Sequence, residues 1–393
     1  MDSSQKLTNT DVKKLNKNRI FRLIYNSDKI SRQEIADQLG LSLPTVNQNL
    51  KMLMEDGLIE YVGNFTSTGG RRAQAITINN NARKAISVNI KAGYINVDVV
   101  GLKGQIIYSM AVKAHFSKSS AYIEKLTDAV RHAVDYVGAD ADDILGVGVT
   151  VPGILDDEKQ ILISAPPLKA KNYDFTRLIS AIDYPVVVMN DARAEAYADH
   201  WFNGKPEDEK IYIMLGEGVG GAYINASAIR NGVHNRGGEF GHMVIHPGGK
   251  QCLCGKKGCF EAYVSEKVLS SELDMTLDNF FELAAQGNKN NSNVLDEYMD
   301  NLALGINNIY TMMDCDIVLG GTVAPYLKQY DNSIKERLVN DYSFDTDADY
   351  LRISDGGGRK SGLGAALSFV ARFIDGVESV SYTHLTLPTI LRV

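Results

Sequence analysis

The sequence predicts an α/β protein in two parts: a small helical domain that ends in a β-hairpin, and a larger part in which strands and helices alternate. The chain of 393 residues is too long for one compact core and suits two or three domains. Apolar residues first recur at helical spacing and then, from about residue 85, gather in short strand-like runs. The charge also changes sign, because residues 1–84 carry 13 Lys and Arg against 8 Asp and Glu, whereas the remainder carries 28 against 40.

The composition excludes several classes of protein. Hydrophobic residues make up 44% and charged residues 23% of the chain, which is ordinary for a globular protein. We find no run of about 18 apolar residues and no apolar stretch after Met1, so we expect neither a membrane span nor a secretory signal. Three of the four cysteines lie between Cys252 and Cys259, which predicts a reducing, cytoplasmic setting rather than a disulfide framework. The basic N-terminal part suggests contact with phosphates, although a solvated basic face explains its charge equally well.

The first two helices are predicted from periodicity and capping. Apolar residues recur at helical spacing over 11–25. Ser31 and Glu34 form a capping-box pattern at the start of a second, shorter helix. Gly40 is expected to end that helix, because glycine adopts the left-handed conformation at little cost. The sequence therefore predicts two helices joined by a short connection.

A third helix follows a tight turn and completes a helix-turn-helix pattern. It is capped by Ser42 or Leu43 and carries Pro44 near its first turn. Its predicted core positions are Val46, Leu50 and Leu53. Asn and Gln can bond adenine edges in the major groove, and Thr can touch a thymine methyl group. The predicted DNA-facing residues are Ser42, Thr45, Asn47, Gln48 and Lys51.

A basic hairpin after the third helix resembles a wing. A turn and strand over 56–62 precede a returning strand over 75–78. Between them lies Ser-Thr-Gly-Gly-Arg71-Arg72, in which the glycines permit close approach and the two arginines are expected to enter a minor groove or bind phosphates. Residues 1–80 are therefore predicted to form a winged helix-turn-helix. The alternative is a protein-interaction domain with a solvated hairpin.

The larger part reads as an α/β domain with its polar residues at strand ends. Strands are expected over 86–90, 95–100, 105–108, 144–149, 184–189 and 211–215, with helices over 121–137 and 362–373. Two of these strands end in Pro152-Gly153 and in Asn190-Asp191. Because sites in such folds lie at strand ends, these turns are candidates for ligand binding.

The most specific chemical signal is His242 followed by Cys252-Leu-Cys254-Gly-Lys-Lys-Gly-Cys259. Three thiolates and one imidazole are the ligands that a structural zinc ion prefers. Gly255 lets the chain turn tightly enough for the thiols to converge. We therefore expect a closed, structural Zn²⁺ site. The alternative is three reduced cysteines in a glycine-rich loop.

Polar residues next to this loop have the chemistry of a sugar site. Glu239 precedes His242, and Glu261 follows the last cysteine. With Asn190 and Asp191 they offer short acceptors that can bind and orient sugar hydroxyls. Each of these residues taken alone is more often a surface or capping residue.

Taken together, these motifs identify the chain as similar to the ROK family, which groups bacterial repressors, open reading frames and sugar kinases. The matching segments are 31–53, 67–74, 148–153, 190–193, 216–221, 239–242, 252–261 and 319–322. The resemblance is to the branch of repressors that regulate xylose, glucose or N-acetylglucosamine genes. It implies a two-lobed, actin-like sugar-kinase fold of the ribonuclease H-like ATPase type, with lobes over 85–190 and 191–376.

The resemblance also implies functions for individual residues. Asn190, Asp191, Glu239, His242 and Glu261 would line a sugar site, and Asp191 matches the general base of the kinases. His242, Cys252, Cys254 and Cys259 would hold zinc. The implied partners are operator DNA, which two winged helices of a homodimer or dimer of dimers would contact, and a sugar or sugar-phosphate inducer. The residues do not distinguish between these two inducers.

The phosphate-binding loops depart from the kinase pattern. Where the family's kinases have Asp-x-Gly-Gly-Thr, this chain has Asn89 followed by Lys91 and Ala92 in place of the glycines. Glu217 replaces a usual threonine in the second loop, where a carboxylate would repel polyphosphate. Phosphoryl transfer depends on positioning and charge, so we predict a regulator and not an enzyme. An active sugar kinase with an added DNA-binding domain, and a regulator controlled by a partner protein, remain the alternatives.

The segment 377–393 has no evident relation to the fold and is predicted to be an appended, non-native tail. The alternative is a genuine terminal strand.

Overall fold

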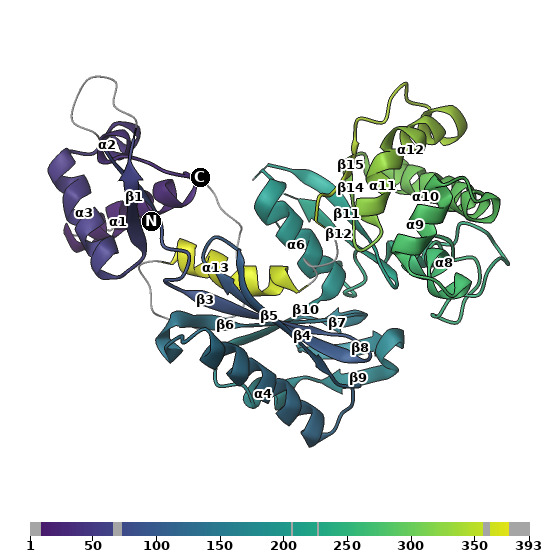
Figure 1. The fold of residues 1–393 in the computed structure, drawn as a ribbon, viewed down its shortest axis with the longest axis horizontal. Helices are drawn as coiled ribbons and strands as arrows, with labels where there is room; N and C mark the ends of the chain where they lie inside the picture. Colours follow the sequence, from purple (N-terminus) through teal and green to yellow (C-terminus); the bar gives the residue numbers. More distant parts are fainter. Residues whose placement is uncertain (1–8, 66–72, 206, 226–227, 357–361, 377–393) are drawn as a thin grey trace, which may run out of the picture.

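The computed structural model describes residues 9–65, 73–205, 207–225, 228–356 and 362–376. Figure 1 shows a small N-terminal domain beside two α/β lobes. Arg71, Arg72 and the segment 377–393 lie outside the described residues. Within the described part of the chain, no helix has both the length and the apolar character needed to cross a membrane.

The N-terminal domain contains three helices and one hairpin. Its elements are α1 (Asn9–Tyr25), α2 (Arg32–Leu39), α3 (Leu43–Glu55), β1 (Ile59–Asn64) and β2 (Gln74–Ile78), and the two strands pair antiparallel. The capping box is confirmed: the Glu34 amide donates to Ser31 Oγ at 3.3 Å, and the Ser31 amide donates to Glu34 Oε2 at 2.8 Å. Gly40 ends α2 with φ 64°, as predicted. Ser42 caps α3.

The first lobe is built on a five-stranded sheet in the order β10-β6-β3-β4-β5. Its strands are β3 (Lys84–Ile90), β4 (Tyr94–Gly101), β5 (Ile106–Lys113), β6 (Ile144–Val151) and β10 (Val186–Asn190). The first three strands form an antiparallel meander, and β6 and β10 add to it in parallel. Helix α4 (Ser120–Tyr136) covers one face, and β7 (Ile154–Asp156), β8 (Ile161–Ala165) and β9 (Ala170–Asp174) form a small extra sheet.

The second lobe repeats the plan with a sheet in the order β13-β12-β11-β14-β15. Its strands are β11 (Glu209–Leu215), β12 (Val219–Asn225), β13 (Ala228–Arg230), β14 (Asp316–Gly320) and β15 (Leu351–Ile353). Its helices include α7 (Glu261–Val264), α8 (Glu266–Leu269), α9 (Leu277–Ala285), α10 (Lys289–Met313), α11 (Ala324–Leu327) and α12 (Asp331–Arg337). The apolar core between α10 and this sheet is continuous.

Two helices, α6 (Asp191–Asn203) and α13 (Leu363–Asp375), pack directly against each other. Any side chain on Gly364 would collide with the Ala194 carbonyl oxygen, so the two backbones touch. Helix α13 also packs on β6 and β3, where Gly148 admits Ala365. The predicted range 191–376 for the second lobe therefore includes a helix that the structure packs on the first sheet, because the small residues of α13 fit under β6. The domain boundaries themselves stay a prediction.

The N-terminal domain rests on these two helices. Asn18 donates to the carbonyls of Ile374 and Asp375 at 3.3 Å each, and Arg22 forms an ion pair with Asp375 at 2.8 Å. One hydrophobic cluster runs from α1–α3 into α6 and α13 without interruption. The domain is therefore packed into the rest of the molecule and is not a loosely tethered unit.

Candidate functional site

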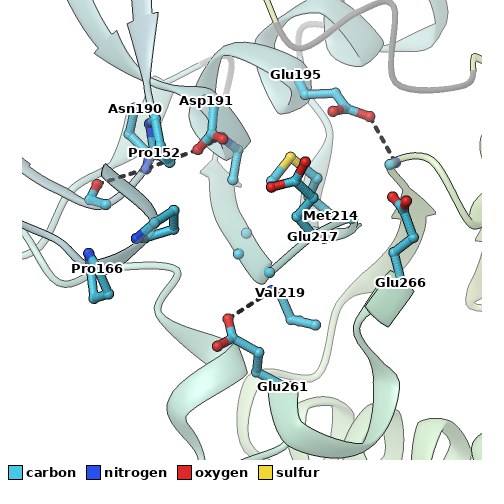
Figure 2. Close-up of a pocket in the computed structure, with 18 of the residues that line it drawn as sticks. Pro152, Pro166, Asn190, Asp191, Glu195, Met214, Glu217, Val219, Glu261 and Glu266 are labelled. Atoms are coloured by element: carbon cyan, nitrogen blue, oxygen red, sulfur yellow. Dashed lines mark hydrogen bonds between the residues drawn. The ribbon is translucent and has the colours of Figure 1, made fainter. Parts of the chain in front are cut away.

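A cavity of about 300 Å³ lies between the lobes, at the carboxyl ends of β3, β6, β10 and β11. This volume falls at the lower end of the range for small-molecule sites. All five residues predicted to bind sugar line it: Asn190, Asp191, Glu239, His242 and Glu261. Figure 2 shows Asp191, Glu217, Glu261 and Glu266 arranged around the same space. Their role in binding stays a prediction.

Asn190 and Asp191 are fixed by the junction of β10 and α6. Asn190 is the N-cap of α6, because its side-chain oxygen accepts from the Arg193 amide at 3.0 Å. Its side-chain amide donates to the Gly153 carbonyl at 2.8 Å, and so ties this turn to the end of β6. Asp191 Oδ1 accepts from the Ala192 amide at 3.0 Å. Both side chains are therefore held in one orientation at the cavity wall.

Lys91 projects into the cavity from the turn after β3 and lies 3.6 Å from Asp191 Oδ2. Burial alone would lower the pKa of Lys91, but Asp191 and Glu217 raise it above its usual value, so the ammonium group stays charged. Asn89, Ala92 and Glu217 line the same cavity. The structure thus brings together the four residues that are predicted to depart from the kinase pattern.

Glu261 connects the cysteine loop to the glycine-rich turn after β11. Its Oε2 accepts from the Val219 amide at 3.0 Å, and its Oε1 lies 3.5 Å from Cys252 Sγ (Figure 2 shows the first contact). Glu239 lies beside His242, with its Oε2 3.7 Å from His242 Nε2. Burial raises the pKa of Glu239, and the charges of His242 and Arg193 partly offset this effect.

His242, Cys252, Cys254 and Cys259 converge as predicted, with all four ligand atoms within 4.8 Å of one another. Cys252 Sγ lies 3.8 Å from His242 Nδ1, and Cys254 Sγ lies 3.7 Å from Cys259 Sγ. Bonds of about 2.3 Å to sulfur and about 2.0 Å to nitrogen place the ligands of a tetrahedral zinc ion roughly 3.5–3.8 Å apart, so the donor set fits. His242 directs Nδ1 to this cluster and Nε2 to Glu239, which reconciles its two predicted roles.

Glu195, which the sequence did not single out, lies in the middle of α6 and lines the cavity from the side of β11. It is 1% exposed, and it accepts hydrogen bonds from Tyr212 Oη at 3.0 Å and from the Gly321 amide at 2.7 Å. Burial raises the pKa of Glu195 to about 7, although these two hydrogen bonds oppose the shift. A glutamate inside a helix has no sequence signal for burial, which is why periodicity missed it.

The raised pKa of Glu195 predicts a pH-dependent stability. A carboxyl whose folded pKa exceeds its unfolded value stabilises the fold fully below the unfolded pKa of about 4.5, and this stabilisation is lost as pH rises through about 7. The side chain in Glu195→Gln cannot ionise and serves as the reference. Between pH 4.5 and pH 8, the free energy of unfolding of the wild type should therefore fall by roughly 3 kcal/mol relative to that of this variant. Urea denaturation at the two pH values measures the difference. An equal gap between the two proteins at both pH values would contradict the prediction.

The predicted DNA-facing residues lie on the outer side of α3. Ser42, Asn47, Gln48 and Lys51 are exposed, and Thr45 is half-buried. The predicted core positions Val46, Leu50 and Leu53 are buried, which confirms the orientation of the helix. The Ser42 and Thr45 hydroxyls share a hydrogen bond of 2.9 Å at the helix start. The contribution of these residues to DNA binding stays a prediction.

The fold and the site together define a class of protein: a winged helix-turn-helix followed by a two-lobed α/β domain with a cavity between the lobes. The chain belongs to the ROK family, whose model matches residues 85–370, and a model for a winged helix-turn-helix DNA-binding domain matches residues 15–60.

The similar proteins include transcription regulators of known name. The chain is 28% identical to the xylose repressor of Bacillus subtilis over 319 residues, which cover 79% of this chain and 82% of the relative. It is 26% identical over 264 residues to the Escherichia coli DNA-binding transcriptional dual regulator NagC, covering 67% and 65% of the two chains.

Solved structures show the same fold. A ROK family transcriptional regulator, described as a homologue of the E. coli MLC protein, aligns with a TM-score of 0.70 and 21% identity over 91% of this chain and 96% of its own. The ROK family glucokinase of Streptomyces griseus, in complex with glucose and AMPPNP, aligns with a TM-score of 0.61 and 25% identity over 72% and 98% of the two chains.

Proposed function

We propose that the protein is a sugar-responsive transcription repressor, which binds operator DNA through its winged helix-turn-helix and is released by a sugar that binds between the lobes. Three observations support it. The N-terminal domain matches a winged helix-turn-helix DNA-binding model, and the relatives include the xylose repressor of Bacillus subtilis. A polar cavity lies between the lobes, and the glucokinase of similar fold was solved in complex with glucose.

One observation carries the proposal: a single helix leads from the cavity to the DNA-binding domain. Helix α6 begins at Asp191 in the cavity wall, and its last turn brings Trp201 edge-on against Tyr25 of α1, with ring centroids 6.2 Å apart. Helix α13, packed along α6, meets α1 through Phe373 and Phe21 at 6.3 Å. A sugar that changes the position of α6 therefore also changes the contact between α6 and α1.

The cavity favours regulation over phosphoryl transfer. Asp191, the residue that would act as the base, forms an ion pair with Lys91 at 3.6 Å. Glu217 adds negative charge to the part of the cavity where polyphosphate would bind. Kinase catalysis depends almost entirely on positioning and charge stabilisation, so both features oppose it. We infer that Asp191 is a vestigial base that now binds a sugar hydroxyl.

We further infer that the Cys₃His cluster holds a structural zinc ion, that the protein acts as a homodimer or dimer of dimers on a pseudopalindromic operator, and that it works in the cytoplasm. The donor set and its spacing support the first inference. Free thiols at all four cysteines agree with a reducing compartment. Metal analysis of the purified protein tests the zinc ion, and light scattering tests the oligomeric state.

A DNA-binding assay with sugars tests the proposed function. Operator fragments are first selected in vitro from genomic DNA with the purified protein, and fluorescence anisotropy then follows one fragment as sugars and sugar phosphates are added. We expect at least one carbohydrate to weaken DNA binding by 5-fold or more, within the usual range of about 5–150-fold. Sugar-dependent ATP hydrolysis would instead favour an active kinase, and no response to any carbohydrate would favour control by a partner protein.

The outer side of α3 should carry the sequence specificity. In Asn47→Ala and Gln48→Ala we expect specific DNA binding to weaken by about 1–3 kcal/mol each, because each removes a side chain able to bond a base edge. The matched control is Gln33→Ala on α2, an exposed amide that instead bonds Asp37 at 2.8 Å. Anisotropy on the selected operator and on unrelated DNA separates specific from general affinity. Unchanged discrimination in both α3 variants would contradict the assignment.

A further inference from the structure

The charges around the cavity are unbalanced, and they bear on the kind of ligand that it accepts. Six carboxyl side chains line it: Asp191, Glu195, Glu217, Glu239, Glu261 and Glu266. Against them, the described lining includes three permanent cations: Lys91, Arg193 and Lys267. Even with Glu195 protonated, the part of the wall formed by the described residues carries an excess of negative charge.

Two of the three cations are already paired. Arg193 is 5% exposed and donates to Asp157 at 3.0 Å and to the Asn235 carbonyl at 2.9 Å, so it holds a loop and not a ligand. Lys91 is 24% exposed and faces Asp191, whose side chain is 7% exposed. The third cation, Lys267, also lines the cavity, and no ion pair is observed for it in the described part of the chain. An anionic ligand would therefore find two of the three described cations committed to carboxylates.

The pair of Lys91 and Asp191 connects the ends of two strands of the first sheet at the cavity wall. Lys91 follows β3 of the first sheet, and its backbone amide donates to the Tyr94 carbonyl at 3.0 Å, which fixes the turn. Asp191 directly follows β10 of the same sheet and begins α6, and its other oxygen accepts from the Ala192 amide. The Lys91 backbone and the Asp191 carboxylate are thus both held by backbone hydrogen bonds, and the two side chains form their ion pair without a ligand.

We propose that the cavity binds an uncharged sugar, and that the ion pair of Lys91 and Asp191 selects it against phosphate esters of the same sugar. A sugar hydroxyl can donate to Asp191 and accept from Lys91 while the pair stays intact. A phosphate group competes for Lys91, leaves Asp191 as a buried charge without its cation, and approaches the remaining carboxylates. The inference rests on the proposed function and adds the chemical class of its ligand.

The test is isothermal titration calorimetry of the full chain with D-xylose, D-glucose, N-acetyl-D-glucosamine, glucose 6-phosphate and N-acetylglucosamine 6-phosphate. We expect an uncharged sugar to bind, and its phosphate ester to bind at least tenfold more weakly. Tighter binding of a phosphate ester would overturn the inference and leave the proposed function standing. Binding of none of the five, nor of any other carbohydrate in the DNA assay, would overturn both.

Two variants test the ion pair itself through selectivity, which a general loss of stability does not change. Lys91→Met should weaken binding of the uncharged sugar about tenfold without any gain for the ester, because Asp191 loses its cation. Asp191→Asn frees Lys91 and removes one negative charge, so the ratio of ester to sugar affinity should rise at least tenfold. Lys125→Met on α4 is the control. If the ratio is the same in Asp191→Asn and wild type, the pair is not the selecting element.

Discussion

Replacing Cys259 by serine is expected to abolish sugar binding and leave a protein that stays on its operator in the presence of sugar. Cys259 is 1% exposed and directly precedes Phe260 and Glu261, so a ligand to the proposed zinc ion is two residues from a residue of the cavity wall. His242 joins the same cluster through Nδ1 and lies beside Glu239. Losing the metal therefore releases both sides of the sugar site together.

The expected magnitude is large. Structural zinc contributes about 10–16 kcal/mol of apparent binding free energy in zinc-finger peptides. Even part of this free energy exceeds the binding free energy of a typical sugar, so its loss is enough to abolish sugar binding. Metal content by mass spectrometry, sugar binding by calorimetry and DNA binding by anisotropy should give no zinc, no sugar binding and DNA binding without release. Cys315→Ser is the matched control, because Cys315 lies outside the cluster. Normal sugar release by a zinc-free Cys259→Ser protein would refute the structural role of the metal.

Replacing Trp201 by leucine is expected to uncouple the two sites. The variant keeps an apolar side chain but removes the ring that meets Tyr25 at 6.2 Å and stacks on Tyr197 at 6.5 Å. Trp201 belongs neither to the cavity lining nor to the outer side of α3. We therefore expect sugar affinity and sugar-free DNA affinity to change by less than about threefold, whereas the sugar-dependent change in DNA affinity falls from about 5–150-fold to near one.

The same titrations on Tyr136→Leu provide the control, because Tyr136 is an aromatic residue on α4 that stacks on Tyr108 at 4.2 Å, away from the junction. This control should respond to sugar like wild type. A full sugar response in Trp201→Leu would show that the signal travels by another route, for which the contacts of α13 with Asn18 and Arg22 are the next candidates.

Local signals in the sequence predicted local structure well. The capping box at Ser31, the end of α2 at Gly40 and the cap of α3 at Ser42 depend on a few neighbouring residues, and the structure confirms them. The cysteine spacing predicted the cluster for the same reason, because three of its four ligands lie within eight residues. Periodicity also placed the main strands of the first sheet.

Features that depend on distant partners were not predictable. The kinase pattern marked Lys91 as a departure, but its contact with Asp191 requires two segments 100 residues apart to meet, which spacing does not report. Glu195 reads as an ordinary helix residue, and only packing between α6 and the second sheet buries it. Helix α13 was expected in the second lobe, because chain order alone does not show that it returns to β6. The ion pair of Lys91, the burial of Glu195 and the position of α13 all depend on which distant strands and helices pack together.

The position of α13 has a consequence for how the protein is made. The DNA-binding domain emerges first from the ribosome, but the helix on which it rests comes last: Asn18 and its partner Ile374 are 356 residues apart. At about 5–20 residues per second, this separation corresponds to roughly 20–70 s of synthesis. During that interval the domain lacks its contacts with α13, so the hydrophobic cluster that the two share is still incomplete. A chain that ends before α13 would keep the contact of α1 with α6 but lose the second path from the cavity to the domain, so the two paths become available at different times during synthesis.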